Sequence, residues 1–469
     1  MDAKNEILFM KQMKHSFIYA ILILYNSTVF NQNSNILNDY IQYGIDNNLA
    51  LKQKYDSYEK SLYALKEAKG LFYPSVTLNA RYTVAQGGRI IEFPVGDMLN
   101  DVYSTLNMLT GTQNFPTLEN MEFPFYRGKE QETKLSLVQP LYKPQLYYNE
   151  KIKSELAVIE KYDADSYKRQ LISEIKIAYF NYLKTIQLNE LISRTSYLLK
   201  ENIRVNEKLF ENGMVTKENL YRSQTELSKL NQQQSEIEKN INVSKAYFNF
   251  LLNKPLDSDI SFLDTALTIP SVISLETAWK SASDNREELE ILNNYLEISK
   301  LNIKLNRSEM KPSVFAVADY GFQGEKYDFS MENSDFNNDF LLASVVLQWT
   351  LFKGNSNKAK VQQAKLDSDI LTDKKKQANE QIRLEVMNAH FELKGGMQNI
   401  ILANNQLKTS KEAFKMVNRK YEQGQTSLLE YIDSRTEMTN AEMNAIIARY
   451  DFFIKYAEYE RSACLYEIK

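Results

Sequence analysis

The sequence predicts a mostly helical protein with some β-structure, in which a pair of strands and a long helical hairpin occur twice. Three observations predict this class. Glycine (14) and proline (9) are scarce among the 469 residues, a composition typical of long helices with few turns. Several short segments recur in the same order at matched spacing, which indicates a duplication. Within each copy, the apolar residues first recur every two residues, as in a strand, and later every three to four residues, as in a helix.

The duplication is supported by segments with similar residues at equivalent places. The interval from Leu141 to Gly213 differs by one residue from the interval between Leu351 and Gly424. Ordered anchors at matched spacing are a stronger signal than any single match. The equivalent segments are AKGLFYPSV at 68–76 with NRSEMKPSV at 306–314, QPLYKP at 139–144 with WTLFKG at 349–354, and LFENG at 209–213 with KYEQG at 420–424.

The anchors divide the chain into two repeats and a linker. The first repeat is expected at 33–255 and the second at 272–469, each with a helix, two membrane strands and a helical hairpin. The linker at 256–271 contains Asp257, Asp259 and Pro270. Each repeat is therefore expected to form the same set of elements.

The N-terminus has the pattern of a secretory signal. Lys11 and Lys14 precede an apolar run from Phe17 to Leu24, which is too short to cross a bilayer as a helix. A basic region, a short apolar core and a polar exit are typical of a signal peptide. We expect the signal to cover about residues 1–32, with a buried N-terminal helix as the alternative.

Alternation of apolar and polar residues predicts the strands. After Pro74 it runs through 76–83, after Pro312 it runs through 314–320, and the clearest return segment is 341–349. Each run is about ten residues long, which is enough for a tilted strand to cross a bilayer. The connections at about 84–133 and 321–339 are rich in Gly, Asn and Asp and are expected to be extracellular loops. Aromatic residues lie at the strand ends, at Tyr73, Tyr82, Tyr142, Trp349 and Phe352.

The hairpins show helical periodicity. In the first, Ile175, Tyr179, Leu183 and Ile186 recur at steps of four, four and three residues. Such a stripe is more often a packing seam than a binding groove. The stretch 143–210 contains one proline, at its start, and as an unbroken helix it would be about 100 Å long. Phe414, Val417 and Tyr421 form a similar seam before the second glycine.

Composition and residue inventory argue against several functions. The net charge of −3 provides no general affinity for nucleic acid. A single cysteine, Cys464, rules out an internal disulfide framework. Of the two histidines, His390 lies in a helical stretch beside Phe391, where a structural role is expected. We therefore expect no enzyme activity, no cofactor and no metal site.

A sheet of only four strands would have two unpaired edges. Four strands cannot close a barrel, and an open sheet edge is not tolerated in lipid. The strands belong either to a soluble sheet or to a barrel shared among copies of the chain. The signal pattern, the strand lengths and the aromatic strand ends favour the shared barrel. The alternative is a periplasmic or cytosolic helical scaffold without a pore.

The order of helix, strand, loop, strand and hairpin, given twice, resembles the TolC family of outer-membrane efflux channels. The most specific segments are the two Pro-Ser-Val strand starts, the QPLY before the first hairpin and the YEQGQTSLLEYID at the second hairpin turn. The resemblance implies a homotrimer with a twelve-stranded barrel in outer-membrane lipid and a helical coiled-coil tunnel in the periplasm of a Gram-negative bacterium. It implies an exit duct of a tripartite efflux or type I secretion system, with a periplasmic adaptor (membrane fusion) protein and an inner-membrane pump of the RND or ABC type.

The resemblance also assigns roles to the hairpin turns. Gly213 and Gly424 match the turns where the adaptor docks, and a glycine there permits a tight reversal with positive φ. Tyr421, Glu430 and Asp433 match positions that close the pore, which predicts an acidic constriction.

Two positions depart from the family pattern. Asn219 replaces an acidic residue after the first glycine, although Glu218 is adjacent, and Thr426 replaces a basic gate residue after the second. These departures argue against a gate held by salt bridges.

Overall fold

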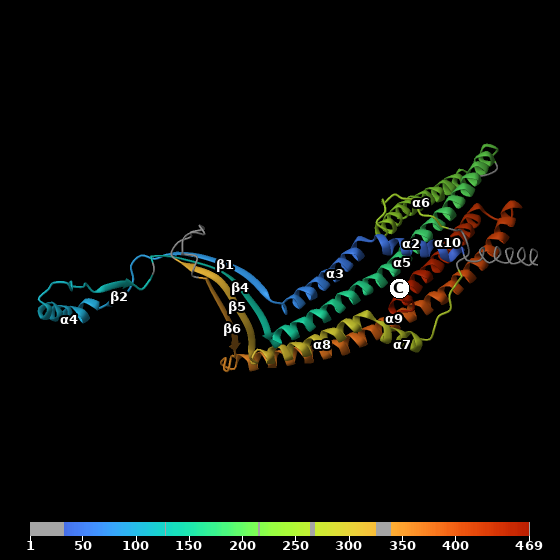
Figure 1. Cartoon of the computed structure of the whole chain (residues 1–469). Coiled ribbons are helices and arrows are strands. Elements are labelled where there is room, and N and C mark those ends of the chain that lie inside the picture. Colours follow the sequence, from blue (N-terminus) through green and yellow to red (C-terminus); the bar gives the residue numbers. More distant parts are fainter. Residues whose placement is uncertain (1–31, 127, 214–215, 263–267, 325–338, 469) are drawn as a thin grey trace, which may run out of the picture. The chain divides into compact units, whose positions relative to one another are not determined.

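The computed structural model describes residues 32–468 apart from 127, 214–215, 263–267 and 325–338, so the predicted signal lies almost wholly outside the described residues. The described chain is mostly helical with a small amount of sheet (Figure 1), as the sequence predicts. It divides into two compact units, and both repeats contribute to each. One unit, here the helical unit, comprises 1–62, 155–298 and 368–469. The other, the strand unit, comprises 63–154 and 299–367.

The two repeats contain matching helices of nearly the same lengths. The helices α3 and α8 have 22 residues each, α6 and α10 have 35 each, and α5 and α9 have 68 and 67. None of the described helices is both long enough and apolar enough to span a membrane. The bounds are α2 Gln32–Asn47, α3 Leu49–Gly70, α5 Pro144–Glu211, α6 Lys217–Leu251, α7 Leu275–Asn285, α8 Glu287–Ser308, α9 Ser356–Glu422 and α10 Leu428–Ser462.

In the helical unit, α5 and α10 are the inner helices. Phe180 on α5 stacks on Phe453 on α10 with ring centroids 5.2 Å apart. On another side of α5, Tyr179 contacts Phe248 of α6 at 5.8 Å. The predicted stripe is a packing seam, because Ile175, Tyr179 and Leu183 are buried in the core and Ile186 packs against it. Helix α9 contacts α10, for example through the ion pair between Glu392 and Lys455 at 2.7 Å.

The strand unit contains a four-stranded antiparallel sheet in the order β1-β4-β5-β6 (Figure 1). Among the described strands, β1 and β6 each pair on one side only. Because side chains alternate along a strand, one face is mainly apolar and the other mainly polar. The bounds are β1 Ser75–Val84, β4 Lys129–Tyr142, β5 Ser313–Gly324 and β6 Asp339–Gln348. The apolar face includes Val76, Leu78, Tyr82, Leu135, Leu137, Val314, Tyr320, Leu341, Val345 and Leu347.

The first connection, expected as a loop at about 84–133, has secondary structure of its own. It contains strands β2 (Ile90–Phe93) and β3 (Met121–Pro124), which pair, and helix α4 (Val95–Thr110) between them. Asn100 exchanges two hydrogen bonds with the backbone of Leu118, and Asn107 does the same with Phe115. The asparagines, which suggested a loop, therefore hold an extended segment against α4. Most of the second connection lies outside the described residues.

Candidate functional site at the hairpin turns

The second hairpin turn is closed by Gly424. Its φ of 70° lies in the left-handed region, where a side chain is strained, so the predicted need for glycine is confirmed. The amide of Gly424 donates to the carbonyl of Tyr421 at 3.0 Å, and that of Gln425 donates to Lys420 at 2.8 Å. This pair of bonds is the Schellman arrangement that ends many helices. The sequence therefore fixes where α9 stops.

Helix α10 then begins with a side-chain cap. The hydroxyl of Ser427 accepts a hydrogen bond from the amide of Glu430 at 3.2 Å. The Glu430 carboxylate accepts a hydrogen bond from the hydroxyl of Thr426, which is the residue found in place of the family's basic one. A carboxylate in the first turn is also stabilised by the helix dipole. Glu430 and Asp433 are both exposed and lie three residues apart, so they are neighbours on one helix face.

Tyr421 lies between the two hairpins. Its ring stacks on Tyr431 with centroids 4.6 Å apart, and its hydroxyl donates to Asn206 of α5 at 3.4 Å. Burial raises the pKa of Tyr421, so its hydroxyl stays protonated. Tyr421 also packs, with Phe414 and Val417, against the buried cluster of Leu428, Tyr431 and Ile432. Sequence reasoning missed Asn206, because nothing in the pattern of α5 separates it from other polar residues.

The first hairpin turn also contains a glycine with positive φ, and residues 214–215 of this turn lie outside the described part of the chain. Gly213 also has a φ of 70°, and its amide donates to Phe210 at 2.9 Å. Among the described residues, no amide donates to the side chain of Thr216, which precedes α6. Glu218 pairs with Arg222 at 3.0 Å within α6, so its carboxylate is already partnered. Both turns contain a glycine with positive φ, and both expose carboxylates, Glu218 at the first and Glu430 and Asp433 at the second.

The polar face of the sheet contains a row of charged side chains across three strands. Arg81 on β1 pairs with Glu132 on β4 at 3.0 Å. The Lys134 ammonium lies 3.2 Å from Glu132 and 3.9 Å from Asp319 on β5. A Cβ atom at Gly321 would lie 2.6 Å from the Cβ of Lys134, so glycine makes room for this lysine. Opposite charges that alternate along the row partly compensate one another on this mainly polar face.

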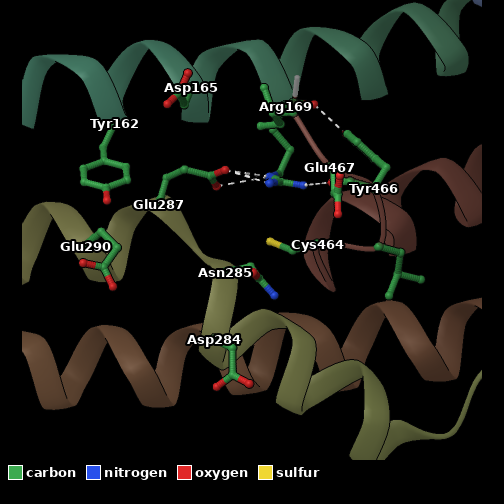
Figure 2. Close-up of a pocket in the computed structure, with 12 residues that line it drawn as sticks. Tyr162, Asp165, Arg169, Asp284, Asn285, Glu287, Glu290, Cys464, Tyr466 and Glu467 are labelled. Atoms are coloured by element: carbon green, nitrogen blue, oxygen red, sulfur yellow. Dashed lines mark hydrogen bonds and ion pairs between the residues drawn. The ribbon is translucent and has the colours of Figure 1, made fainter.

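A separate cavity of about 580 Å³ lies between α5, the start of α8 and the C-terminal segment (Figure 2). Figure 2 shows Arg169 reaching Glu287, and the shortest N–O distance is 2.7 Å. Arg169 also donates to the carbonyl of Tyr466 at 2.8 Å, and the Tyr466 hydroxyl donates to the carbonyl of Arg169. These contacts fix the end of the chain against α5. Burial raises the pKa of the Cys464 thiol in this cavity to about 11, which makes it a poor nucleophile.

The remaining candidate residues have structural surroundings. The ring of His390 lies 5.8 Å from those of Phe391 and Tyr459. Burial lowers the pKa of His390. In the part of the chain that the structure describes, no three His, Cys, Asp or Glu side chains are grouped so that they could hold a metal ion.

Comparisons with known proteins agree with this architecture. The family model described as outer membrane efflux protein matches residues 279–458. No curated protein sequence matches the chain. The Campylobacter jejuni CmeC outer membrane channel is 16% identical, with a TM-score of 0.75 over 92% of this chain and 85% of that one.

Two further outer-membrane protein structures are similar over most of their lengths. The open state of the Neisseria gonorrhoeae MtrE outer membrane channel is 15% identical, with a TM-score of 0.72 over 91% of this chain and 88% of that one. The outer membrane protein VceC from Vibrio cholerae is 12% identical, with a TM-score of 0.72 over 91% of this chain and 95% of that one. At these identities the likeness establishes a shared fold. Together with the family-model match over most of the second repeat, it shows that the chain has the fold of these outer-membrane channels.

Proposed function

We propose that the protein is the outer-membrane exit duct of a tripartite efflux or type I secretion system in a Gram-negative bacterium. In this role it passes small molecules or proteins from the periplasm or an inner-membrane pump to the exterior. It acts as a passive duct and not as an enzyme. The observation that carries the proposal is the amphipathic four-stranded sheet, whose outer strands, among those that the structure describes, each pair on one side only.

The sheet supports an assembly of several copies. Unpaired backbone groups at the edge of a sheet cost several kcal/mol each in lipid, so β1 and β6 must pair with other strands there. The register places Leu78, Leu135 and Tyr320 on the face that would meet lipid. Lys134 and Asp319 then lie on the face that would line a water-filled lumen. Three copies supply twelve strands, within the range of known bacterial barrels.

The helical unit supports the same assembly. Helix α9 buries Ile382, Val386 and Leu393. It leaves other large apolar side chains in solvent, including Ile370 at 53% and Phe391 at 57% exposed. A row of exposed apolar residues on a long helix is expected to pack against a neighbour. A helix of a second copy is the natural occupant, since the sheet edges require that copy as well.

By analogy with the TolC family that the sequence resembles, the protein acts as a trimer with adaptor and pump partners. We assign the docking of a periplasmic adaptor protein to the two turns at Gly213 and Gly424, which have positive φ and are themselves exposed. The pump is of the RND or ABC type. The transported substrate is set by that pump and by the adaptor.

We also assign the constriction to the second turn. Symmetry would bring one Glu430 and one Asp433 from each subunit towards the axis, and a ring of carboxylates favours cations. Tyr421 contributes by holding this turn against Asn206 of the first hairpin. Because Thr426 is uncharged and Glu218 pairs with Arg222, the closed state relies on packing and carboxylates rather than on ion pairs between the turns.

Assembly is tested by the mass of the protein extracted from outer membranes in mild detergent. A trimer that forms pores in planar bilayers is expected. A stable monomer that does not sediment with the outer membranes would favour the helical scaffold without a pore and would contradict the duct.

The constriction is tested by the double change Glu430→Gln and Asp433→Asn, which keeps the shape and removes the charge. In planar bilayers it should weaken cation selectivity and block by multivalent cations while the trimer still forms. Asp373→Asn, on an exposed part of α9 far from the turn, is the matched control and should change neither property. Unchanged selectivity in a correctly assembled double variant would contradict the assignment.

A further inference from the structure

The insertion between β1 and β4 carries an apolar surface that the chain itself leaves exposed. On α4, Met98, Val102 and Leu109 are exposed to 65%, 51% and 78%. On the adjoining hairpin, Ile91 pairs with Phe123 on one face and remains 45% exposed. Monomeric soluble proteins rarely leave so many large apolar side chains together in water. The insertion is therefore built to contact something else.

The spacing on α4 indicates the shape of the partner. Met98, Val102, Thr105 and Leu109 follow one another at steps of four, three and four residues, and all four are exposed. This is the spacing of the core positions of a coiled coil, and we call these four residues the α4 seam. The opposite side of α4 is occupied, because Asn100 and Asn107 hold the segment that leads to β3. A seam of this spacing takes another helix.

The charge of the insertion argues against an anionic membrane surface as the occupant. Residues 85–128 contain five acidic and two basic side chains, and α4 contains Asp97 and Asp101 and no basic residue. Helices that lie on membranes usually present Lys and Arg to the headgroups. Across a parallel seam, Asp101 would face the equivalent of Leu106 rather than another carboxylate. Packing between copies of α4 therefore does not place the carboxylate of Asp101 against another carboxylate.

The position of the insertion brings copies of α4 together. It leaves β1 directly after Val84, and β1 is an outer strand of the sheet. Twelve strands about 4.8 Å apart and tilted by about 40° close around a radius of about 12 Å. The ten residues 85–94 can span up to about 33 Å, so α4 can reach the barrel axis.

We propose that the α4 helices of neighbouring subunits pack through the α4 seam and form a three-helix cap at the outer mouth of the duct. The proposal rests on the trimeric assembly proposed above. Cyclic symmetry makes the helices parallel and places the same residues opposite one another.

The test uses the full chain with one added cysteine. Thr105→Cys and Leu109→Cys place a thiol in the seam, and Ser104→Cys places one on an exposed flank of the same helix. The native cysteine is buried, so the unchanged protein is expected to give no cross-link. Under mild oxidation the seam thiols should form disulfides between subunits. Because a trimer offers three thiols at one axis, at most about two thirds of the chains become covalent dimers. Ser104→Cys should remain monomeric on the same gel.

The mass of each sample in mild detergent separates the two proposals. A trimer without cross-links at either seam position overturns the cap and leaves the duct standing. Absence of the trimer overturns the duct, and the cap fails with it. A further outcome is that the seam thiols form no cross-link but do react with a water-soluble maleimide in detergent. If the same thiols are protected from the maleimide in vesicles of outer-membrane lipid, the occupant is lipid and the cap is wrong. Equal cross-linking at 104 and 105 would also contradict a specific seam.

Discussion

Helices α5 and α9 occupy the same place in the two repeats and have almost the same length, yet their surroundings differ. Helix α5 lies between α6 and α10, and most residues of its middle part, from Leu171 to Leu183, are buried. Helix α9 buries one stripe and leaves Ile370, Leu384 and Phe391 exposed. Duplication has therefore produced an inner and an outer helix from equivalent sequence positions.

This difference separates the contacts that one subunit makes by itself from the contacts that require a second subunit. The contacts of α5 are made within one subunit, so they stabilise the subunit itself. The exposed face of α9 adds little to the stability of a single chain, because the same side chains are in water in the unfolded state. We therefore expect changes on α5 to affect folding and changes on α9 to affect assembly.

The largest expected effect is the loss of the buried ion pair of α5. Glu287→Ala leaves the Arg169 guanidinium without its carboxylate, and both side chains are only 8% exposed. Breaking such a pair costs about 3–5 kcal/mol, so the thermal unfolding midpoint in mild detergent should fall clearly. Asp373→Ala removes an exposed pair with Lys376 on α9 and should leave the midpoint unchanged. Equal midpoints for the two variants would remove the proposed contrast.

A matched pair of isoleucines separates folding from assembly. Ile175→Ala opens a cavity beside Gly44 and Leu252 in the core and should cost about 2–5 kcal/mol in the free energy of unfolding. Ile370→Ala changes a side chain that is 53% exposed and should leave the unfolding of the subunit unaltered. It should instead shift the mass distribution in dilute detergent from trimer towards monomer. A trimer unaffected by Ile370→Ala would show that this face of α9 is not an interface.

The smallest expected effect concerns the turns that end α5 and α9. Ser427→Ala removes the cap on the Glu430 amide and should cost about 1 kcal/mol locally. Hydrogen exchange of the first turn of α10 should then become about five times faster, since local opening controls exchange. Thr216→Ala at the first turn removes no such bond and should leave exchange in α6 unchanged. Faster exchange in both helices would show that the two turns are capped alike.

Much of the architecture was predictable because it follows from local patterns. Alternation predicted the strands after Pro74 and Pro312, and the sheet contains them as β1 and β5. Helical periodicity and the lack of internal proline predicted α5, and the need for positive φ predicted both glycine turns. Each of these signals depends on residues close together in the chain. The insertion was mistaken for a loop, because asparagines that bind a distant backbone look the same in sequence as asparagines in a turn.

The sequence by itself determined the duplicated order of elements, the lengths of the long helices and the positions of the turns. Only the tertiary structure decided which helix of each equivalent pair is buried and which polar residues meet. Asn48 and Arg286 stand at equivalent junctions, yet Asn48 donates to Leu251 of α6 whereas Arg286 pairs with Glu385 of α9. Tyr421 meets Asn206 across more than two hundred residues. Such partners depend on how helices far apart in the chain pack, and no local pattern carries that information.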